Sequence, residues 1–211
     1  MAQKILAALA VLVLSACGGG GSSDPACVPQ QTITVSILGN SIASGLGDDP
    51  TLRSMLFAQF GPGVSVVNHA VGGTEVSDII IGRAGFKSWP QDAGDVTLVL
   101  DGTNEAIRGS SLAQFSADLG TITKRPGVVL IAPPPMDQTI PLTHGADILP
   151  YVQAVRGAKA PADLYAYMMA IQGWQSDLRD GVHPVDPFYA VLSKEVVYPA
   201  VAREVSKLRC Q

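Results

Sequence analysis

Short apolar runs alternate with segments of helical periodicity along most of the chain. Runs rich in β-branched residues predict strands at residues 32–38, 64–68, 96–100 and 128–132, with a weaker fifth run at 164–167. Apolar residues at helical spacing predict helices at residues 51–60, 75–81, 111–124 and 147–156, and a last helix from about 187 to 208 with a bend or break at Pro199.

The predicted strands are almost continuously apolar, which is typical of strands that are covered on both faces. Because helices separate them along the chain, we expect a parallel sheet between two helical layers. A chain of 211 residues with 47% hydrophobic residues is long enough for one domain with a sizeable core and too short for two ordinary domains. The prediction is therefore a single three-layer α/β/α domain with a five-stranded parallel sheet.

The first residues have the pattern of a secretory leader. Lys4 precedes a wholly apolar run at residues 5–14, and ten residues are too few to span the hydrocarbon core of a bilayer. The run ends in Leu14-Ser15-Ala16-Cys17, which resembles a bacterial lipobox. This resemblance implies cleavage before Cys17 and acylation of that residue, which would anchor the chain to a membrane without spanning it. An ordinary secretory signal with a chance cysteine is the alternative.

The leader divides the chain into a signal peptide at residues 1–16, a lipidated Cys17 with a Gly/Ser-rich flexible linker at 17–26, and a folded domain at 27–211. The lipobox resemblance places the protein in the bacterial cell envelope. Gly18 carries no inner-membrane retention signal, so the outer membrane is expected, facing the periplasm or the cell surface. In this oxidising compartment Cys27 and Cys210 are expected to form a disulfide, with two free thiols as the alternative.

Charge and motif spacing exclude several function classes. The chain has 14 Lys and Arg against 18 Asp and Glu, and it has no basic run, so we expect no nucleic-acid partner. We find no His/Cys/Glu cluster at metal-ligand spacing and no glycine-rich phosphate-binding loop. The sequence therefore predicts neither a metal nor a cofactor.

Polar residues that suit acyl transfer follow the predicted strands. Ser41 follows the first strand, Gly73 the second and Asn104 the third, while Asp180 and His183 precede the last helix. A serine hydroxyl needs a base to become nucleophilic, and a histidine held by a carboxylate is such a base. The backbone N–H groups of Ser41 and Gly73 and the amide of Asn104 can form the oxyanion hole for the tetrahedral intermediate.

Four blocks in this order resemble the SGNH/GDSL hydrolases, a family of serine esterases and lipases: Gly39-Asn40-Ser41, Gly72-Gly73, Gly102-Thr103-Asn104-Glu105 and Asp180-Gly181-Val182-His183. The similarity extends from residue 32 to the final helix. It implies a flavodoxin-like five-stranded parallel sheet and a catalytic triad of Ser41, His183 and Asp180. It also implies an oxyanion hole of Ser41, Gly73 and Asn104.

Two positions depart from the family pattern. Position 40 is Asn where the family has Asp, and Glu105 stands where the family has Asp. Neither change affects a triad or oxyanion residue, and we expect the Asn40 amide still to accept hydrogen bonds in its turn. Structural roles remain open for single residues: Ser41 or Asn104 as a helix cap, and Gly72 in place of Gly73 in the oxyanion hole.

These features predict a serine esterase that hydrolyses carboxylic esters, with short acyl groups, through an acyl-enzyme intermediate. The substrate class stays open among small-molecule esters, lipids and acetylated glycans, and the sequence does not determine the oligomeric state. A non-catalytic envelope lipoprotein that binds a glycan or lipid in the same pocket is the alternative. Asn40 is the one feature that favours this alternative.

Overall fold

The computed structural model describes residues 32–209. The predicted signal peptide, the lipidated Cys17 and the linker lie outside these residues. Cys27 and Cys210, the predicted disulfide partners, lie outside them as well.

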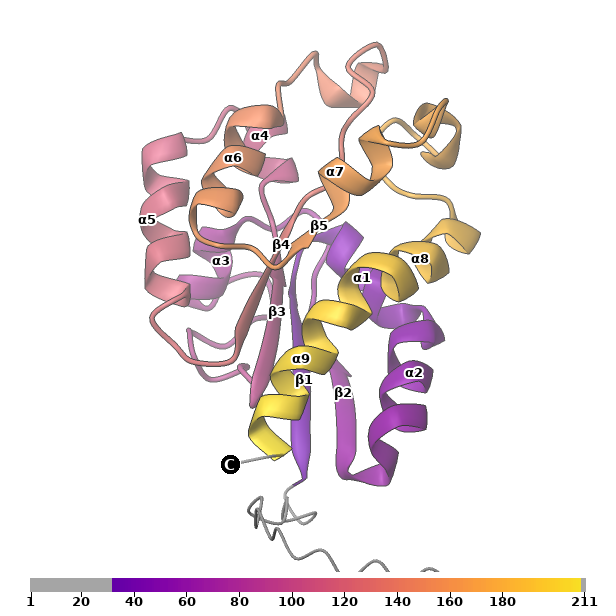
Figure 1. The fold of residues 1–211 in the computed structure, drawn as a ribbon. Helices are drawn as coiled ribbons and strands as arrows, with labels where there is room; N and C mark the ends of the chain where they lie inside the picture. The colour runs from indigo at the N-terminus through magenta and orange to yellow at the C-terminus, as the bar shows by residue number, and fades with distance from the viewer. Residues whose placement is uncertain (1–31, 210–211) are drawn as a thin grey trace, which may run out of the picture.

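The centre of the fold is one five-stranded sheet in which every strand is parallel to its neighbours, in the order β2-β1-β3-β4-β5 (Figure 1). The strands are β1 (Ile33–Gly39), β2 (Val64–Asn68), β3 (Val96–Leu100), β4 (Val128–Ala132) and β5 (Ala162–Asp163). The prediction of a five-stranded parallel sheet is confirmed.

Helices cover both faces of this sheet, as a parallel sheet requires (Figure 1). One face carries α1 (Ser41–Asp48), α2 (Pro50–Phe60), α8 (Asp186–Leu192) and α9 (Tyr198–Arg209). The other face carries α3 (Val76–Ile81), α5 (Leu112–Ile122) and α6 (Leu149–Gly157). Two short helices, α4 (Thr103–Arg108) and α7 (Leu164–Met169), follow β3 and β5, and single 3₁₀ turns lie at Gly61–Gly63, Pro141–Thr143 and Trp174–Asp177. The predicted three-layer architecture is therefore also confirmed.

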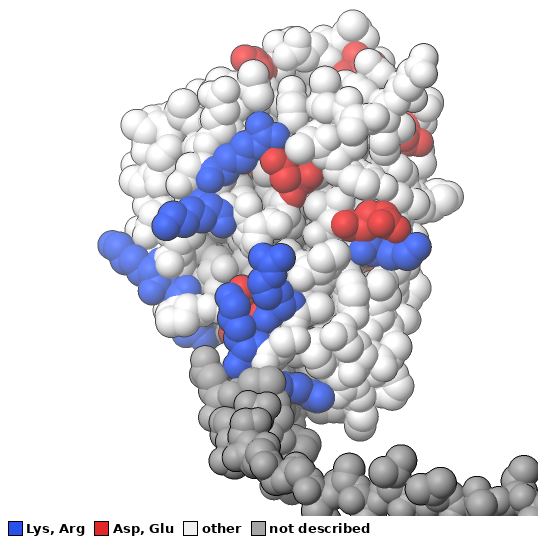
Figure 2. Space-filling model, viewed as in Figure 1, with Lys and Arg blue, Asp and Glu red and all other residues white. Residues whose placement is uncertain are grey.

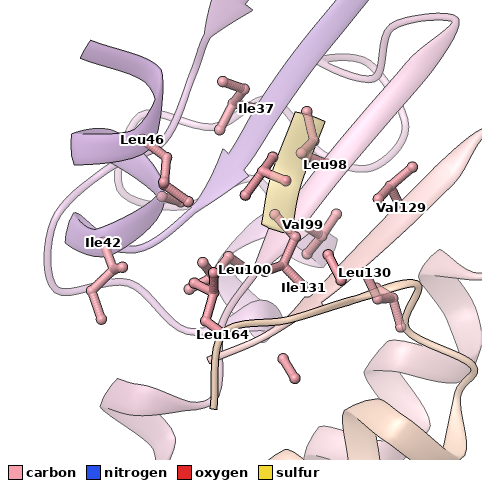
Figure 3. Close-up of a cluster of buried hydrophobic side chains, with 14 of the residues drawn as sticks. Ile37, Ile42, Leu46, Leu98, Val99, Leu100, Val129, Leu130, Ile131 and Leu164 are labelled. Atoms are coloured by element: carbon pink, nitrogen blue, oxygen red, sulfur yellow. The ribbon is translucent and has the colours of Figure 1, made fainter. Parts of the chain in front are cut away.

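The core lies between the sheet and each helical layer. All five residues of β3 are buried, and only one residue of β1 is partly exposed. Figure 3 shows Ile42 and Leu46 of α1 beside the sheet residues Ile37 and Leu98, and all four side chains are buried. Burial of each such side chain contributes about 1.5–3 kcal/mol. Strand β2 lies at an edge of the sheet, and its side chains alternate between more and less exposed positions.

The predicted fifth strand is wrong in position. Residues 164–167 form the start of α7, and the strand itself is only Ala162–Asp163. The Asp163 side chain accepts a hydrogen bond from the backbone N–H of Ala166 at 2.8 Å, so it caps the helix and ends the strand. Leu164 and Met168, four residues apart, are the buried positions of that helix.

The last helical segment is not broken at Pro199, and its irregular turn lies before the proline. A π-helical turn at Ser193–Val197 joins α8 to α9 without a gap. In a regular α-helix the Pro199 ring would clash with the carbonyl group of Glu195, four residues earlier. The wider π turn includes Glu195, so the irregularity lies in the turn before the proline.

Strand order locates the functional edge of the sheet. From β1 the chain moves outward to β2, and it then returns past β1 to form β3 on the other side. Ligands of open parallel sheets bind at the carboxyl ends of strands at such a reversal. Ser41 comes two residues after β1, and Asp101 directly follows β3. Within residues 32–209, no helix is both long and apolar enough to cross a bilayer.

Candidate active site

Ser41 is the first residue of α1, and Asn40 caps that helix. The Asn40 Oδ1 atom accepts hydrogen bonds from the backbone N–H groups of Ile42 at 2.9 Å and Ala43 at 3.5 Å. The amide thus accepts hydrogen bonds in the turn, as predicted. The backbone N–H of Ser41 has no acceptor in the described part of the chain, because the first N–H groups of a helix lack intrahelical partners.

The structure brings Ser41, His183 and Asp180 together. The Ser41 Oγ atom lies 2.7 Å from His183 Nε2, although the two residues are 142 positions apart in the chain. On the other side of the ring, His183 Nδ1 lies 2.8 Å from Asp180 Oδ2 and 3.1 Å from Oδ1. With a proton on Nδ1 bonded to the carboxylate, Nε2 is the ring nitrogen free to accept a hydrogen bond from the Ser41 hydroxyl.

Hydrogen bonds keep the Asp180 carboxyl ionised. Partial burial raises its pKa, but the backbone N–H and ring of His183 and the backbone N–H of Val182 donate to the carboxylate and outweigh that effect. The pKa therefore lies below its ordinary value. A carboxylate that remains charged can both orient the imidazole and stabilise the imidazolium that forms during proton transfer.

A closed turn holds Asp180 beside His183. The Arg179 N–H donates to the His183 carbonyl at 2.8 Å, and Leu178 and Pro184 form an antiparallel bridge across the base of the turn. Gly181 has φ +82°, and a Cβ there would lie 2.7 Å from the Ile140 side chain. The turn therefore needs glycine at its tip, both for the left-handed backbone and for the contact with the neighbouring loop.

Gly73 lies in the turn beside Ser41, and Asn104 of α4 is hydrogen-bonded to the next residue of that turn, Thr74. A Cβ on Gly72 would lie 3.6 Å from the Ser41 Cβ, which places this turn against the serine. The N–H of Gly73, a residue with φ +79°, makes no hydrogen bond among residues 32–209. Asn104 Nδ2 donates one hydrogen to the Thr74 carbonyl at 2.7 Å, which leaves its second hydrogen free.

Glu105 binds these two loops to each other. Its side chain is 2% exposed; Oε1 accepts the Val76 N–H at 2.7 Å, and Oε2 accepts the Gly102 N–H at 2.8 Å. Sequence reasoning assigned no role to this departure from the family pattern. The structure shows that the carboxylate connects the start of α3 to the start of α4, and thereby the Gly73 turn to Asn104.

Arg108 adds a second connection between the same loops. Its guanidinium donates to the Gly73 carbonyl at 2.6 Å and to Glu75 Oε1 at 3.1 Å. Glu75 Oε1 also accepts from the Ser110 hydroxyl at 3.0 Å. The Gly73 turn is therefore held by side chains of α4 and of the residues that follow it. Sequence reasoning missed Arg108, since a single arginine on a short helix carries no signal of its own.

Two buried carboxyl groups lie behind these loops. Burial is the main cause that raises the pKa of Glu105 to about 7, and backbone hydrogen bonds oppose it only in part. Burial and the nearby Glu105 also raise the pKa of Asp101 well above its ordinary value. Neither carboxyl oxygen of Asp101 has a hydrogen-bond partner in residues 32–209. The raised pKa values of these two groups mean that a double negative charge is disfavoured behind Gly73 and Asn104.

A cavity of about 470 Å³ opens on the other side of Ser41, between α1 and α8. Ser41 and His183 lie at its edge, and its wall includes Asp48, Arg179 and Tyr189. A Cβ on Gly45 of α1 would lie 2.3–2.7 Å from the Tyr189 ring and hydroxyl, so this glycine allows the close approach of the tyrosine. Nothing in the sequence pattern had indicated these wall residues. Within residues 32–209, no three His, Cys, Asp or Glu side chains are placed to hold a metal ion.

Comparison with known proteins identifies the fold. No protein-family model matches the chain, and no curated protein matches it. Among solved structures, a lipase/acylhydrolase from Enterococcus faecalis is 23% identical, with a TM-score of 0.61 over 83% of this chain and 96% of that one. The acetyl xylan esterase AlAXEase is 18% identical, with a TM-score of 0.64 over 80% and 100% of the two chains. A candidate SGNH hydrolase from Slackia heliotrinireducens is 20% identical, with a TM-score of 0.58 over 81% and 99%.

The chain has the SGNH hydrolase fold. The fold implied by the sequence resemblance is thereby confirmed, over more than nine-tenths of each of these three structures. In this fold the four sequence blocks meet at the carboxyl ends of β1, β2 and β3 and at the turn before α8.

Proposed function

We propose that this protein is a serine ester hydrolase with Ser41, His183 and Asp180 as its catalytic triad. One observation carries the proposal: Ser41 Oγ lies 2.7 Å from His183 Nε2, while Asp180 Oδ2 lies 2.8 Å from Nδ1 of the same ring. Nucleophile, base and orienting carboxylate are thus in hydrogen-bond contact, in the order that acyl transfer requires.

The first half-reaction transfers the acyl group to the protein. Ser41 Oγ attacks the ester carbonyl carbon while His183 Nε2 takes the hydroxyl proton. The carbonyl oxygen becomes an oxyanion, and the free N–H groups of Ser41 and Gly73 and the second amide hydrogen of Asn104 donate to it. The intermediate then collapses: the bond to the alcohol oxygen breaks, His183 returns the proton to that oxygen, and an acyl-Ser41 ester remains.

The second half-reaction restores the serine. His183 removes a proton from a water molecule, which attacks the acyl carbon and forms a second oxyanion in the same hole. This intermediate releases the carboxylic acid, and Ser41 Oγ regains its proton from His183. The two steps consume one ester and one water and produce one alcohol and one acid.

We propose short acyl groups as the preferred acyl half of the substrate. Several structural neighbours are named acetyl xylan esterases, which supports small acyl groups for this fold. Hydrolysis of p-nitrophenyl acetate, butyrate and octanoate by the purified protein tests the assignment. We expect the highest kcat/KM for acetate and loss of activity in Ser41→Ala; equal rates for the wild type and Ser41→Ala would refute the triad.

Covalent labelling separates the enzyme from a binding protein with the same pocket. A fluorophosphonate reacts with a serine only when a base activates its oxygen. We expect labelling of the wild type at Ser41 and none in Ser41→Ala or His183→Ala. A wild-type protein that binds ligands yet stays unlabelled would instead be the non-catalytic lipoprotein.

We also propose that the protein is anchored in the bacterial envelope through Cys17 and closed by a disulfide between Cys27 and Cys210. The Leu14–Cys17 segment supports the anchor. The disulfide is supported by the fold, because the start of β1 and the end of α9 lie at the same end of the molecule (Figure 1). Labelled palmitate should enter the wild type and not Cys17→Ser, and the unreduced protein should be lighter than the reduced protein by the mass of two hydrogen atoms.

A further inference from the structure

The cavity between α1 and α8 can be assigned to one half of the ester. In the first half-reaction His183 gives its proton to the departing alcohol oxygen, so the alcohol must lie on the His183 side of Ser41. Ser41 and His183 both line the cavity, whereas Gly73 and Asn104, the proposed oxyanion residues, do not. The cavity is therefore placed to receive the alcohol and not the carbonyl oxygen.

We propose that this cavity binds a neutral, polyhydroxylated alcohol, as found in an uncharged sugar, and excludes anionic alcohols. The inference rests on the proposed ester hydrolysis and adds the chemical class of the alcohol. A volume of about 470 Å³ is within the usual range of small-molecule sites. The deciding evidence is the chemistry of its wall.

The wall offers hydrogen-bonding groups of both kinds. Ser44 and Tyr189 supply hydroxyl groups, and Asp48, Asp49 and Asp186 supply carboxylate oxygens. Burial is the main cause that raises the pKa of Tyr189 to about 12, so its hydroxyl keeps its proton and can donate. Each hydroxyl of a sugar both donates and accepts, and it can therefore pair with either kind of group. A long aliphatic alcohol would instead remove water from the carboxylates without replacing their hydrogen bonds.

The charge of the wall is negative. Asp48 and Asp49 have no cation within 4 Å in the described chain, and their oxygens accept from neutral groups: Asn68 and Ser44 for Asp48, and the Thr51 N–H for Asp49. The single arginine of the wall, Arg179, lies 3.7 Å from Asp186. Three carboxylates against one guanidinium repel an anionic group of the substrate.

The part of the surface farthest from the entry into β1 is also acidic. On the face viewed in Figure 2, Lys and Arg side chains gather toward the end where the chain enters β1, and the opposite tip of the molecule shows Asp and Glu side chains and no Lys or Arg. Arginines do lie closer to the carboxyl ends of the strands, since Arg156 pairs with Asp163 of β5 at 2.7 Å and Arg179 belongs to the cavity wall. The acidity of the cavity therefore comes from the wall residues themselves.

The cavity wall is also built from defined contacts. Asn68 Nδ2 donates to Asp48 Oδ1 at 2.9 Å and to the Ser44 carbonyl at 3.1 Å, which holds the end of α1 against β2. Tyr189, 6% exposed, packs directly on Gly45. These contacts fix the positions of Asp48 and Tyr189 on opposite helices of the cavity.

Three acetate esters that differ only in the alcohol test the proposal on the full-length protein: monoacetylated methyl glucoside, monoacetylated methyl glucuronoside and hexyl acetate. We expect the highest kcat/KM for the neutral glucoside. In Asp48→Asn the preference for the glucoside over the glucuronoside should fall on the order of threefold to tenfold, because one uncompensated charge is removed. Glu195→Gln, an equal charge change on the exposed surface outside the cavity, should leave the ratio unchanged.

Salt provides a readout that needs no variant. Raising NaCl from about 0.05 to about 0.5 M should reduce the discrimination against the glucuronoside in the wild type, because salt screens exposed charges. Equal or faster hydrolysis of the glucuronoside, or a preference for hexyl acetate, would overturn the proposal while ester hydrolysis stands. Failure to hydrolyse even p-nitrophenyl acetate would overturn the proposed function itself, and this inference with it.

Discussion

The two sides of Ser41 are built differently. On the oxyanion side, the loops after β2 and β3 are joined by Glu105, which is 2% exposed, and by Asn104 and Arg108. On the cavity side, the charged pair of Arg179 and Asp186 is 3.7 Å apart, with 59% and 88% of the two side chains exposed. One side holds backbone groups at fixed positions, and the other presents charged groups to solvent.

This difference matches two separate requirements of the proposed reaction, which are stabilisation of the oxyanion and recognition of the alcohol. Oxyanion donors act only if they are already in place when the negative charge develops, so their loops must be rigid. Recognition of an alcohol requires complementary charge and hydrogen bonding, which exposed side chains can provide while they remain hydrated. We therefore expect substitutions on the oxyanion side to lower kcat or stability, and substitutions on the cavity side to alter KM and substrate preference.

Replacement of matched asparagines gives the largest expected contrast. Asn104→Ala removes a proposed oxyanion donor and the bond to the Thr74 carbonyl, and kcat for p-nitrophenyl acetate should fall by about 10²–10³. Asn68→Ala removes bonds to Asp48 and Ser44 on the cavity side, together with one bond from the Ala70 N–H, and kcat should fall by less than about tenfold. Similar kcat losses in the two variants would contradict the division between the two sides.

The buried Glu105 should make stability depend on pH. Its pKa rises from 4.5 to about 7 in the folded protein, so the folded state holds the proton more tightly than the unfolded state. The contribution is fully present below about pH 4.5 and is lost as the pH rises through 7, with a total of about 3 kcal/mol. The raised pKa of Asp101 acts in the same direction.

Glu105→Gln isolates this contribution. The amide has one acceptor oxygen for two backbone N–H groups, so the variant should lose about 1–3 kcal/mol at pH 5. The difference in unfolding free energy between wild type and variant should shrink between pH 5 and pH 8, because only the wild type carries the titrating group. Urea unfolding at several pH values measures it, and a difference that stays constant with pH would contradict the buried titration.

Gly45→Ala should disturb the cavity side with a smaller effect. The new methyl group would meet the Tyr189 ring and hydroxyl at 2.3–2.7 Å, and the overpacking should cost about 1–3 kcal/mol and raise KM for sugar esters. Gly120→Ala on α5 is the matched control, since no atom lies within 4 Å of its Cβ, and it should stabilise the protein by about 0.5–1 kcal/mol. An unchanged KM in Gly45→Ala would show that Tyr189 does not take part in substrate binding.

Arg179→Gln should have the smallest effect on stability. The pair with Asp186 is long and exposed, so the unfolding free energy should change by less than about 0.5 kcal/mol in thermal or urea unfolding. If Arg179→Gln lowered the free energy of unfolding as much as Glu105→Gln does, the cavity side would contribute as much to stability as the oxyanion side.

The sequence by itself determined much of this fold. Almost continuous apolar runs identified β1, β3 and β4, because strands buried on both faces leave little room for polar residues. The edge strand β2 was identified by its β-branched residues, although its side chains alternate in exposure. Short helices were harder to predict. Helices α1 and α4 follow glycine turns and span only eight and six residues, which is too few to show a clear helical periodicity of apolar residues. The strand prediction for residues 164–167 failed for a related reason, because a short apolar run fits a strand or a helix. The hydrogen bond from the Ala166 N–H to the Asp163 side chain caps the helix that forms there.

The sequence also determined which residue types stand at which strand ends, and that order was enough to suggest acyl transfer. Only the tertiary structure decided what these residues touch. Ser41 and His183 are 142 positions apart, and no local pattern encodes a 2.7 Å contact between them. Glu105 and Tyr189 gained their roles in the same way, because the partners that define them, Val76 and Gly45, come from distant parts of the chain that meet only once the sheet has formed.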